Sequence, residues 1–185
     1  SLDRRQRQMC IRDRHGPDGL KAIAERVNRL ACIFADGARA GGLSVTSHYF
    51  FDTVHIETDT ADEVMEAAGR VGFNLRRTTK GVSLSFDETS NEQVVRTLWQ
   101  IFGIDADFEI CDQKRLGSVP LPLDRQSDYL THPVFHNYRS ETEMMRYLRH
   151  LADKDLALDR TMIPLGSCTM KLNAAAEMMP ISWTE

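Results

Sequence analysis

The chain has 185 residues, of which 42% are hydrophobic, so it can bury one ordinary core with a smaller unit beside it. The formal net charge of -4 gives no general field that would attract nucleic acid or an anionic membrane surface. No run approaches the roughly 20 apolar residues that span a bilayer, and the first residues lack the apolar core of a secretory signal. We therefore expect a cytoplasmic protein that binds neither nucleic acid nor membrane.

The cysteines and histidines show no spacing typical of a metal site. The four cysteines are far apart and include neither a CxxC pair nor a Cys/His cluster: Cys10, Cys32, Cys111 and Cys168. The closest histidines, His132 and His136, are separated by Pro133, so their four-residue spacing does not place both on one helical face. We predict reduced cysteines and no metal.

Residues 1–14, SLDRRQRQMCIRDR, contain five arginines and almost no periodic apolar pattern. This segment resembles translated adapter sequence, and we predict that it is foreign to the fold or disordered. A natural, solvated basic tail is the alternative.

A long helix is predicted from residue 17 to about residue 41. Its apolar residues recur at spacings of three and four and therefore share one face: Leu20, Ile23, Ala24, Val27, Leu30, Ala31 and Phe34. The next segment, 43–58, is rich in β-branched and aromatic residues, which favours a strand.

Three helix starts are predicted from a hydroxyl residue followed three positions later by glutamate. This is the pattern of a capping box, in which each side chain satisfies a free backbone amide of the other residue. The pairs are Thr60 with Glu63, Thr89 with Glu92, and Ser140 with Glu143. Gly72 and Gly103 are predicted to end the first two helices.

Segments 73–77 and 81–86 predict two short strands, the second with Val82, Leu84 and Phe86 on one face. The order helix, strand, helix, strand, strand, helix predicts a small α+β domain over residues 15–112. Prolines and a polar run then indicate a linker over 113–137, and the helix opened by Ser140 begins a last segment, 138–185.

The loop formed by residues 166–169 places two hydroxyls and a thiol just before a segment of helix-forming composition. Free amides at a helix start, the hydroxyls of Ser167 and Thr169 and the nearby Lys171 would suit a carboxylate or phosphate, although such residues are more often ordinary caps. Cys168 could be a nucleophile. No histidine lies near it in sequence to act as its base, so a packed small side chain is the favoured alternative.

Two other groups of polar residues are weaker candidates. Arg76 and Arg77 follow a predicted strand and could clamp a carboxylate, but an arginine pair at a strand end is more often solvated. His132, His136 and Tyr138 could line a pocket, yet packing under the next helix is the more common use of such residues.

The C-terminal third, HPVFHNYRSETEMMRYLRHLADKDLALDRTMIPLGSCTMKLNAAAEMMPISW, closely resembles the junction region of the glycine dehydrogenase (decarboxylating) P-proteins. HGPDGLKAIAERVNRLA, FFDTVHIET, NLRR and SFDETS are similar to the same family in the same order. The resemblance covers residues 15–185 and suggests an internal fragment of such a protein.

The resemblance implies a chain that spans two halves, each with the aspartate-aminotransferase-like fold of type I pyridoxal phosphate enzymes. Residues 15–112 would be the small C-terminal domain of the non-catalytic half, and residues 138–185 would begin the catalytic half. In the family, glycine is decarboxylated on pyridoxal phosphate and its aminomethyl group passes to the lipoyl-lysine of the H-protein. The resemblance also implies a homodimer.

By the same resemblance, Ser167, Cys168 and Thr169 are expected to line the pocket, with Lys171 and Asn173 in support. The family's cofactor-bound lysine follows a histidine, and none of the five lysines here does. We therefore expect this chain alone to hold no covalent cofactor and to decarboxylate nothing. A free-standing α+β binding or regulatory module and a subunit of a split P-protein are the alternatives.

Overall fold

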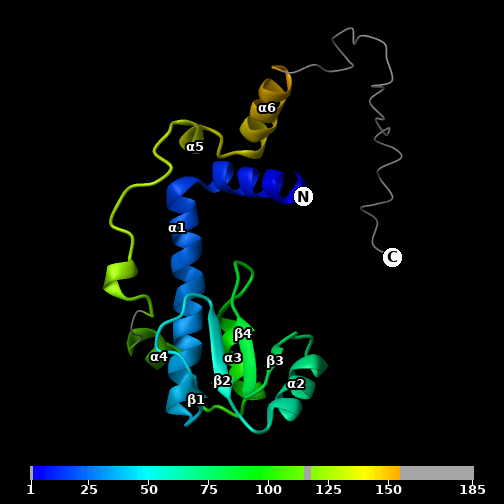
Figure 1. Ribbon diagram of the computed structural model, residues 1–185, viewed down its shortest axis with the longest axis vertical. Helices are drawn as coiled ribbons and strands as arrows, with labels where there is room; N and C mark the ends of the chain where they lie inside the picture. Colours follow the sequence, from blue (N-terminus) through cyan, green and yellow to red (C-terminus); the bar gives the residue numbers. More distant parts are fainter. Residues whose placement is uncertain (1, 115–117, 155–185) are drawn as a thin grey trace, which may run out of the picture. The chain divides into compact units, whose positions relative to one another are not determined.

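The computed structural model describes residues 2–114 and 118–154, in two compact units that divide after Arg139 (Figure 1). The first unit contains a long helix, a four-stranded sheet and the shorter helices that pack on them. The second contains one described helix, α6 (Glu141–Ala152). The helices and the small antiparallel sheet confirm the predicted α+β class. Within the described ranges, no helix is both long and apolar enough to cross a bilayer.

Helix α1 (Leu2–Ala40) contains a break at Gly16, where φ is 59° and ψ is -171°. Pro17 follows the break and starts the straight part of the helix, as the sequence predicted. Residues 2–15 continue as helix on the other side of the break, so this segment has regular structure. Its foreign origin stays a prediction.

The second half of α1 is buried on more than one side. Val27, Leu30, Ala31 and Phe34 lie in the core, as the apolar spacing predicted. Cys32 and Ile33 are buried as well, although they lie off that face. A second helix, α4 (Phe108–Lys114), also packs against α1. The sequence did not predict α4, and the prediction therefore included only one buried face.

The sheet has four antiparallel strands in the order β1-β2-β4-β3. The strands are β1 (Ser44–Val45), β2 (Thr53–Glu57), β3 (Arg76–Thr78) and β4 (Gly81–Ser85). The prediction of one strand over 43–58 was wrong in extent, because this segment forms two strands. The chain leaves the sheet over residues 46–52 and then forms β2, which pairs with β1. A stretch rich in β-branched and aromatic residues does not reveal an internal turn.

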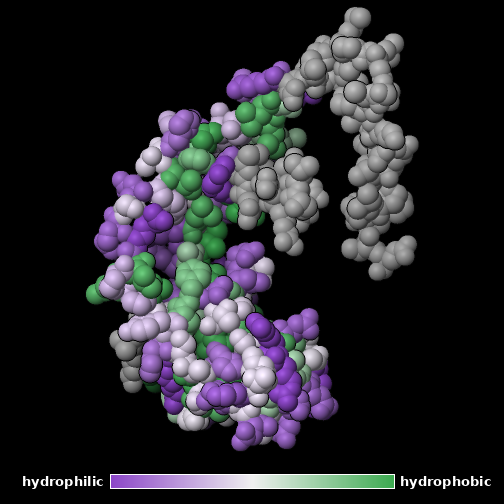
Figure 2. All heavy atoms as spheres, in the orientation of Figure 1, coloured by the Kyte–Doolittle hydropathy of each residue, from purple (hydrophilic) through white to green (hydrophobic). Residues whose placement is uncertain are grey.

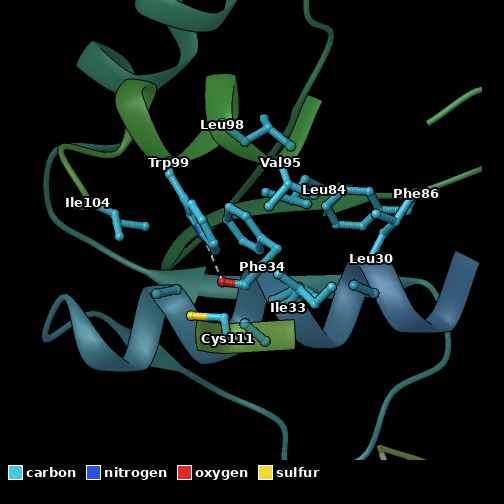
Figure 3. Close-up of a cluster of buried hydrophobic side chains, with 14 of the residues drawn as sticks. Leu30, Ile33, Phe34, Leu84, Phe86, Val95, Leu98, Trp99, Ile104 and Cys111 are labelled. Carbon is cyan, nitrogen blue, oxygen red and sulfur yellow. Dashed lines mark hydrogen bonds between the residues drawn. The ribbon is translucent and has the colours of Figure 1, made fainter. Parts of the chain in front are cut away.

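One face of the sheet is covered by α1, α3 (Glu92–Ile101) and α2 (Ala61–Arg70). Val82, Leu84 and Phe86 are all buried on this face, which confirms their prediction. Figure 3 shows the core beneath it, where the rings of Phe34 and Phe86 lie 5.9 Å apart. The indole Nε1 of Trp99 donates a hydrogen bond of 3.1 Å to the backbone oxygen of Phe34.

The three predicted capping boxes had different outcomes. The Ser140 box is confirmed, since its hydroxyl accepts from the Glu143 amide at 3.2 Å and the Glu143 carboxylate accepts from the Ser140 amide at 3.1 Å. At α2, Thr60 makes no cap hydrogen bond because its hydroxyl bonds to that of Thr58 instead. At α3, Asn91 is the N-cap, and its side-chain oxygen accepts from the backbone amide of Val94.

The predicted ends of α2 and α3 are confirmed at Gly72 and Gly103. Both glycines have positive φ, 82° and 67°, which favours a residue without a Cβ. After Gly103, the amide of Ile104 bonds back to Trp99 O at 2.8 Å, and after Gly72, the Phe73 amide bonds back to Ala68 O at 2.9 Å. These bonds satisfy carbonyls that the helix ends would otherwise leave free.

The segment expected to be a linker, 113–137, contains short regular pieces. A 3-10 turn, η1 (Leu121–Leu123), and a single helical turn, α5 (Val134–Asn137), lie in it. Residues 118–139 form an arch that contacts α1 at both ends, through Ser118 at Asn28 and through Arg139 at the break. We call this segment the arch below.

Candidate functional site

The residues expected to line the pocket lie outside the described part of the chain. Ser167, Cys168, Thr169, Lys171 and Asn173 all belong to residues 155–185. Their proposed roles therefore stay predictions, and the described residues are considered on their own geometry.

The arginine pair at β3 does not form a joint clamp. Consecutive strand residues point to opposite faces, and Arg76 and Arg77 lie opposite Ser83 and Val82 in the register. Arg77 is bound by α2, with its Nε 2.9 Å from the Asp62 carboxylate. The two guanidinium groups therefore lie on different faces of the sheet. Both side chains are exposed, which agrees with the prediction of a solvated pair.

His132 and His136 make local backbone contacts in the arch. His132 Nδ1 accepts from the Val134 amide at 3.1 Å, which caps the first turn of α5. His136 Nε2 lies 3.0 Å from the backbone oxygen of Leu130, and both imidazoles are exposed. His132 therefore has a structural role in the arch, whereas His136 also lines a hollow between the arch and α1, as the pocket prediction required.

The polar segment that follows β4 forms a tight turn around Asp87. One oxygen of its carboxylate accepts from the amides and hydroxyls of Thr89 and Ser90, at distances between 2.7 and 3.1 Å. The hydroxyl of Thr89 contributes most, and together these donors hold the pKa of Asp87 below its ordinary value of 3.8. The turn directs the chain into α3.

The break in α1 is held by residues at the end of the arch. A helix break leaves carbonyl groups without their regular donors. The guanidinium of Arg139 donates to the backbone oxygen of His15. It also occupies the space that a Cβ at Gly16 would need, together with the backbone oxygen of Phe135. Only glycine therefore allows both the positive φ and this close approach.

Two further contacts support the same junction. The Tyr129 hydroxyl donates to the backbone oxygen of Pro17 at 2.6 Å. The guanidinium of Arg12 lies 4.8 Å from the centre of the Phe135 ring and bonds to Asp13, whose exposed fraction is only 3%. The sequence gave no signal for this junction, because Gly16 and Arg139 are more than 120 residues apart.

A large hollow lies between α1 and the arch, with a volume of about 1280 Å³. Its lining includes the apolar residues Leu20, Ala24, Phe51, Val119 and Leu123. Its charged residues are Asp18, Lys21, Glu25, Asp124, Arg125 and Asp128.

The edge of the hollow beside Asn28 is fixed by a partly buried polar network. The side-chain amide of Asn28 donates to Phe51 O at 2.6 Å and contacts Ser118 Oγ at 2.7 Å. Ser118 in turn donates to Phe50 O at 2.7 Å, and Cys32 Sγ lies 3.2 Å from the same hydroxyl. Polar networks whose members bond to one another in this way rigidify their surroundings. Among the described residues, Cys32 and Cys111 are both buried in the core and neither is joined in a disulfide.

The lysines whose side chains are described do not suit a covalent pyridoxal phosphate site. A lysine that binds a cofactor covalently needs an enclosed position, and Lys21, Lys80 and Lys154 are exposed on the surface. Within residues 2–114 and 118–154, no group of three or more His, Cys, Asp or Glu side chains is arranged to hold a metal ion.

Comparison with known proteins gives a consistent match. The family described as "Glycine cleavage system P-protein" matches residues 8–102. The chain is 50% identical over 172 residues to "Glycine dehydrogenase (decarboxylating)" of Bradyrhizobium sp. (strain BTAi1), and 51% identical to the protein of that name from Xanthomonas oryzae pv. oryzae. Each match covers 92% of this chain and only 18% or 17% of the relative, so the chain spans less than a fifth of their length.

Proposed function

The chain belongs to the glycine cleavage system P-protein family, and on that premise we propose that it forms part of a glycine dehydrogenase (decarboxylating). This enzyme would release the carboxylate of glycine as carbon dioxide and pass the aminomethyl group to lipoylated H-protein. Pyridoxal phosphate, when bound, supplies the electron sink for the decarboxylation. The observation that carries the proposal is that the similarity runs through 92% of the chain and so extends beyond residues 15–112. A free-standing α+β module would account only for the similarity within residues 15–112.

Residues 15–112 would be the small C-terminal domain of a non-catalytic half with the type I fold of pyridoxal phosphate enzymes. The antiparallel sheet with helices on one face supports this assignment. Residues 113–137 would connect the two halves, and 138–185 would open the catalytic half. A homodimer and a cytoplasmic location complete the proposal.

The loop around residues 166–169 would form one wall of the catalytic pocket. The hydroxyls of Ser167 and Thr169 and the thiol of Cys168 would face the substrate, with Lys171 and Asn173 in support. Fixed donors of this type orient a carboxylate or a sulfur and contribute to catalysis by positioning.

The chain by itself would be inactive, because Lys21, Lys80 and Lys154 are exposed and no lysine in the sequence follows a histidine. The decisive experiment uses the full-length polypeptide that contains this sequence. With pyridoxal phosphate and lipoylated H-protein, we expect glycine-dependent exchange of labelled bicarbonate into glycine. The 185-residue chain under the same conditions should show none.

Variants separate the role of the loop from that of the fold. Thr169→Val and Cys168→Ser should reduce the exchange rate by about tenfold or more, while Thr89→Val, in a surface turn, should leave it unchanged. Full-length protein that binds cofactor but exchanges no label would refute the proposed function.

A further inference from the structure

The hollow between α1 and the arch is larger than a small molecule requires. Small-molecule pockets occupy roughly 300–1,000 Å³, whereas this one measures about 1280 Å³. It is also partly open to solvent rather than enclosed. Its dimensions suit a segment of polypeptide.

Several large apolar side chains beside the hollow are exposed to solvent. Leu121 is 84% exposed, Leu123 is 74% exposed, and Phe51 is 48% exposed. Val119 belongs to the same group, at 37%. In Figure 1, η1 is the unlabelled yellow-green turn to the left of α1. Figure 2 shows hydrophobic spheres at this place, next to hydrophilic spheres along the arch. Several exposed apolar side chains gathered beside one hollow mark an interaction site.

The charges around the hollow are predominantly acidic. Of its two cations, Lys21 lies 3.8 Å from Glu25 and Arg125 stacks over the Tyr129 ring at 5.4 Å. Among the described residues that line the hollow, the carboxylates without an ion pair are those of Asp18, Asp124 and Asp128. An occupant with apolar and basic side chains would match both features of the surface.

The walls of the hollow are already in place. Tyr129 joins the upper part of the arch to Pro17, and Asn28 joins its lower end to the loop at Phe51 through Ser118. A surface fixed by such bonds loses little conformational entropy when it is covered.

We propose that this hollow is the docking site for an amphipathic segment with basic side chains, from the part of the same polypeptide outside residues 1–185. The inference rests on the proposed function, because it takes the chain as part of a longer enzyme. The length outside the chain supports it, since the matched relatives extend over more than five times the aligned region. The occupant's apolar side chains cover Phe51 and Leu123, and its cations pair with Asp124 and Asp128.

Photo-crosslinking of the full-length polypeptide tests the proposal. A benzophenone amino acid at Leu123 should yield an intramolecular adduct with a peptide outside residues 1–185 that contains lysine or arginine. The same probe at Val71, which is 54% exposed at the end of α2, should give at least tenfold less of this adduct. Mass spectrometry of the digested protein identifies the peptide.

Charge reversal tests the acidic part of the site. Asp124→Lys with Asp128→Lys should lower the Leu123 adduct at least tenfold, whereas the matched pair Asp59→Lys with Asp105→Lys, on exposed positions elsewhere, should leave it unchanged. The thermal midpoint of each variant should stay close to that of the parent, which verifies folding.

Four results would overturn the proposal: an adduct with a second copy, an adduct with another protein, an adduct within residues 1–185, or no adduct from either Leu121 or Leu123. The crosslink needs no catalytic turnover. Glycine exchange measured on the same preparation therefore tells a failure of the docking site from a failure of the proposed function.

Discussion

Trp99 packs so closely on Gly37 that a Cβ at residue 37 would overlap its indole ring. The same indole donates to Phe34 O one turn earlier on α1, so the ring cannot withdraw without losing a buried hydrogen bond. Gly37→Ala should therefore destabilise the chain by about 1–3 kcal/mol, as expected for overpacking of a core. Urea unfolding followed by tryptophan fluorescence measures the loss.

Gly69→Ala provides the matched control, because Gly69 also lies in a helix but has nothing within 4 Å of its Cβ position. There the smaller conformational freedom of alanine should stabilise the chain by about 0.4–1 kcal/mol. Equal effects at the two glycines would contradict the packing explanation.

The start of α3 depends on Asn91 rather than on the predicted Thr89. Asn91→Ala removes the acceptor of the Val94 amide and should cost about 0.5–2 kcal/mol, whereas Asn91→Asp keeps an acceptor and should cost much less. Thr60→Ala should change the free energy of unfolding by only a few tenths of a kcal/mol, since Thr60 caps no amide. The three unfolding free energies, measured together, test this order.

Asp87 should contribute to stability in a way that depends on pH. Its folded pKa lies below the ordinary value of 3.8, so its contribution is present above that pH and is lost as pH falls through the folded pKa. The advantage of the parent over Asp87→Asn should therefore shrink below about pH 4. Carboxyl NMR titration should place the Asp87 midpoint below 3.8, and a higher midpoint would refute the turn geometry.

The junction at the α1 break should be sensitive to one hydroxyl. Tyr129→Phe removes the donor to Pro17 O and should cost about 0.5–1.5 kcal/mol, with faster amide exchange in the arch. Tyr49→Phe, on a side chain that is 68% exposed, should have no effect. Gly16→Ala should lower the free energy of unfolding more than Tyr129→Phe does. The alanine would have to adopt a positive φ, and its Cβ would overlap the Arg139 guanidinium.

Local patterns predicted most of the α+β domain. The apolar spacing from Val27 to Phe34 and the glycine stops at Gly72 and Gly103 depend on neighbours in sequence, and the structure confirms them. Leu20 and Ala24 share the predicted face but are only half-buried, and they line the hollow instead. The wrong caps have a local cause as well. Thr60 and Thr89 found competing hydroxyl or carboxylate partners, Thr58 and Asp87, within two residues.

The features that the sequence did not predict depend on contacts between distant residues. Cys32 and Ile33 are buried because distant segments, among them α4 and Ser118, pack against α1. The Gly16–Arg139 contact and the hollow under the arch likewise join segments that no local pattern relates. The expected pocket loop at 166–169 falls outside the described residues, so its role depends on the family resemblance.

The order of the strands has a consequence for association between molecules. The two outermost strands are the shortest, since β1 has two residues and β3 has three, while the five-residue β2 and β4 lie inside. The sheet therefore offers few unpaired backbone amides and carbonyls along its edges, and β3 carries two adjacent arginines. Short, charged edges oppose the strand-to-strand stacking that leads to fibrils. Contacts with other polypeptides are therefore left to side-chain surfaces rather than to the sheet edges.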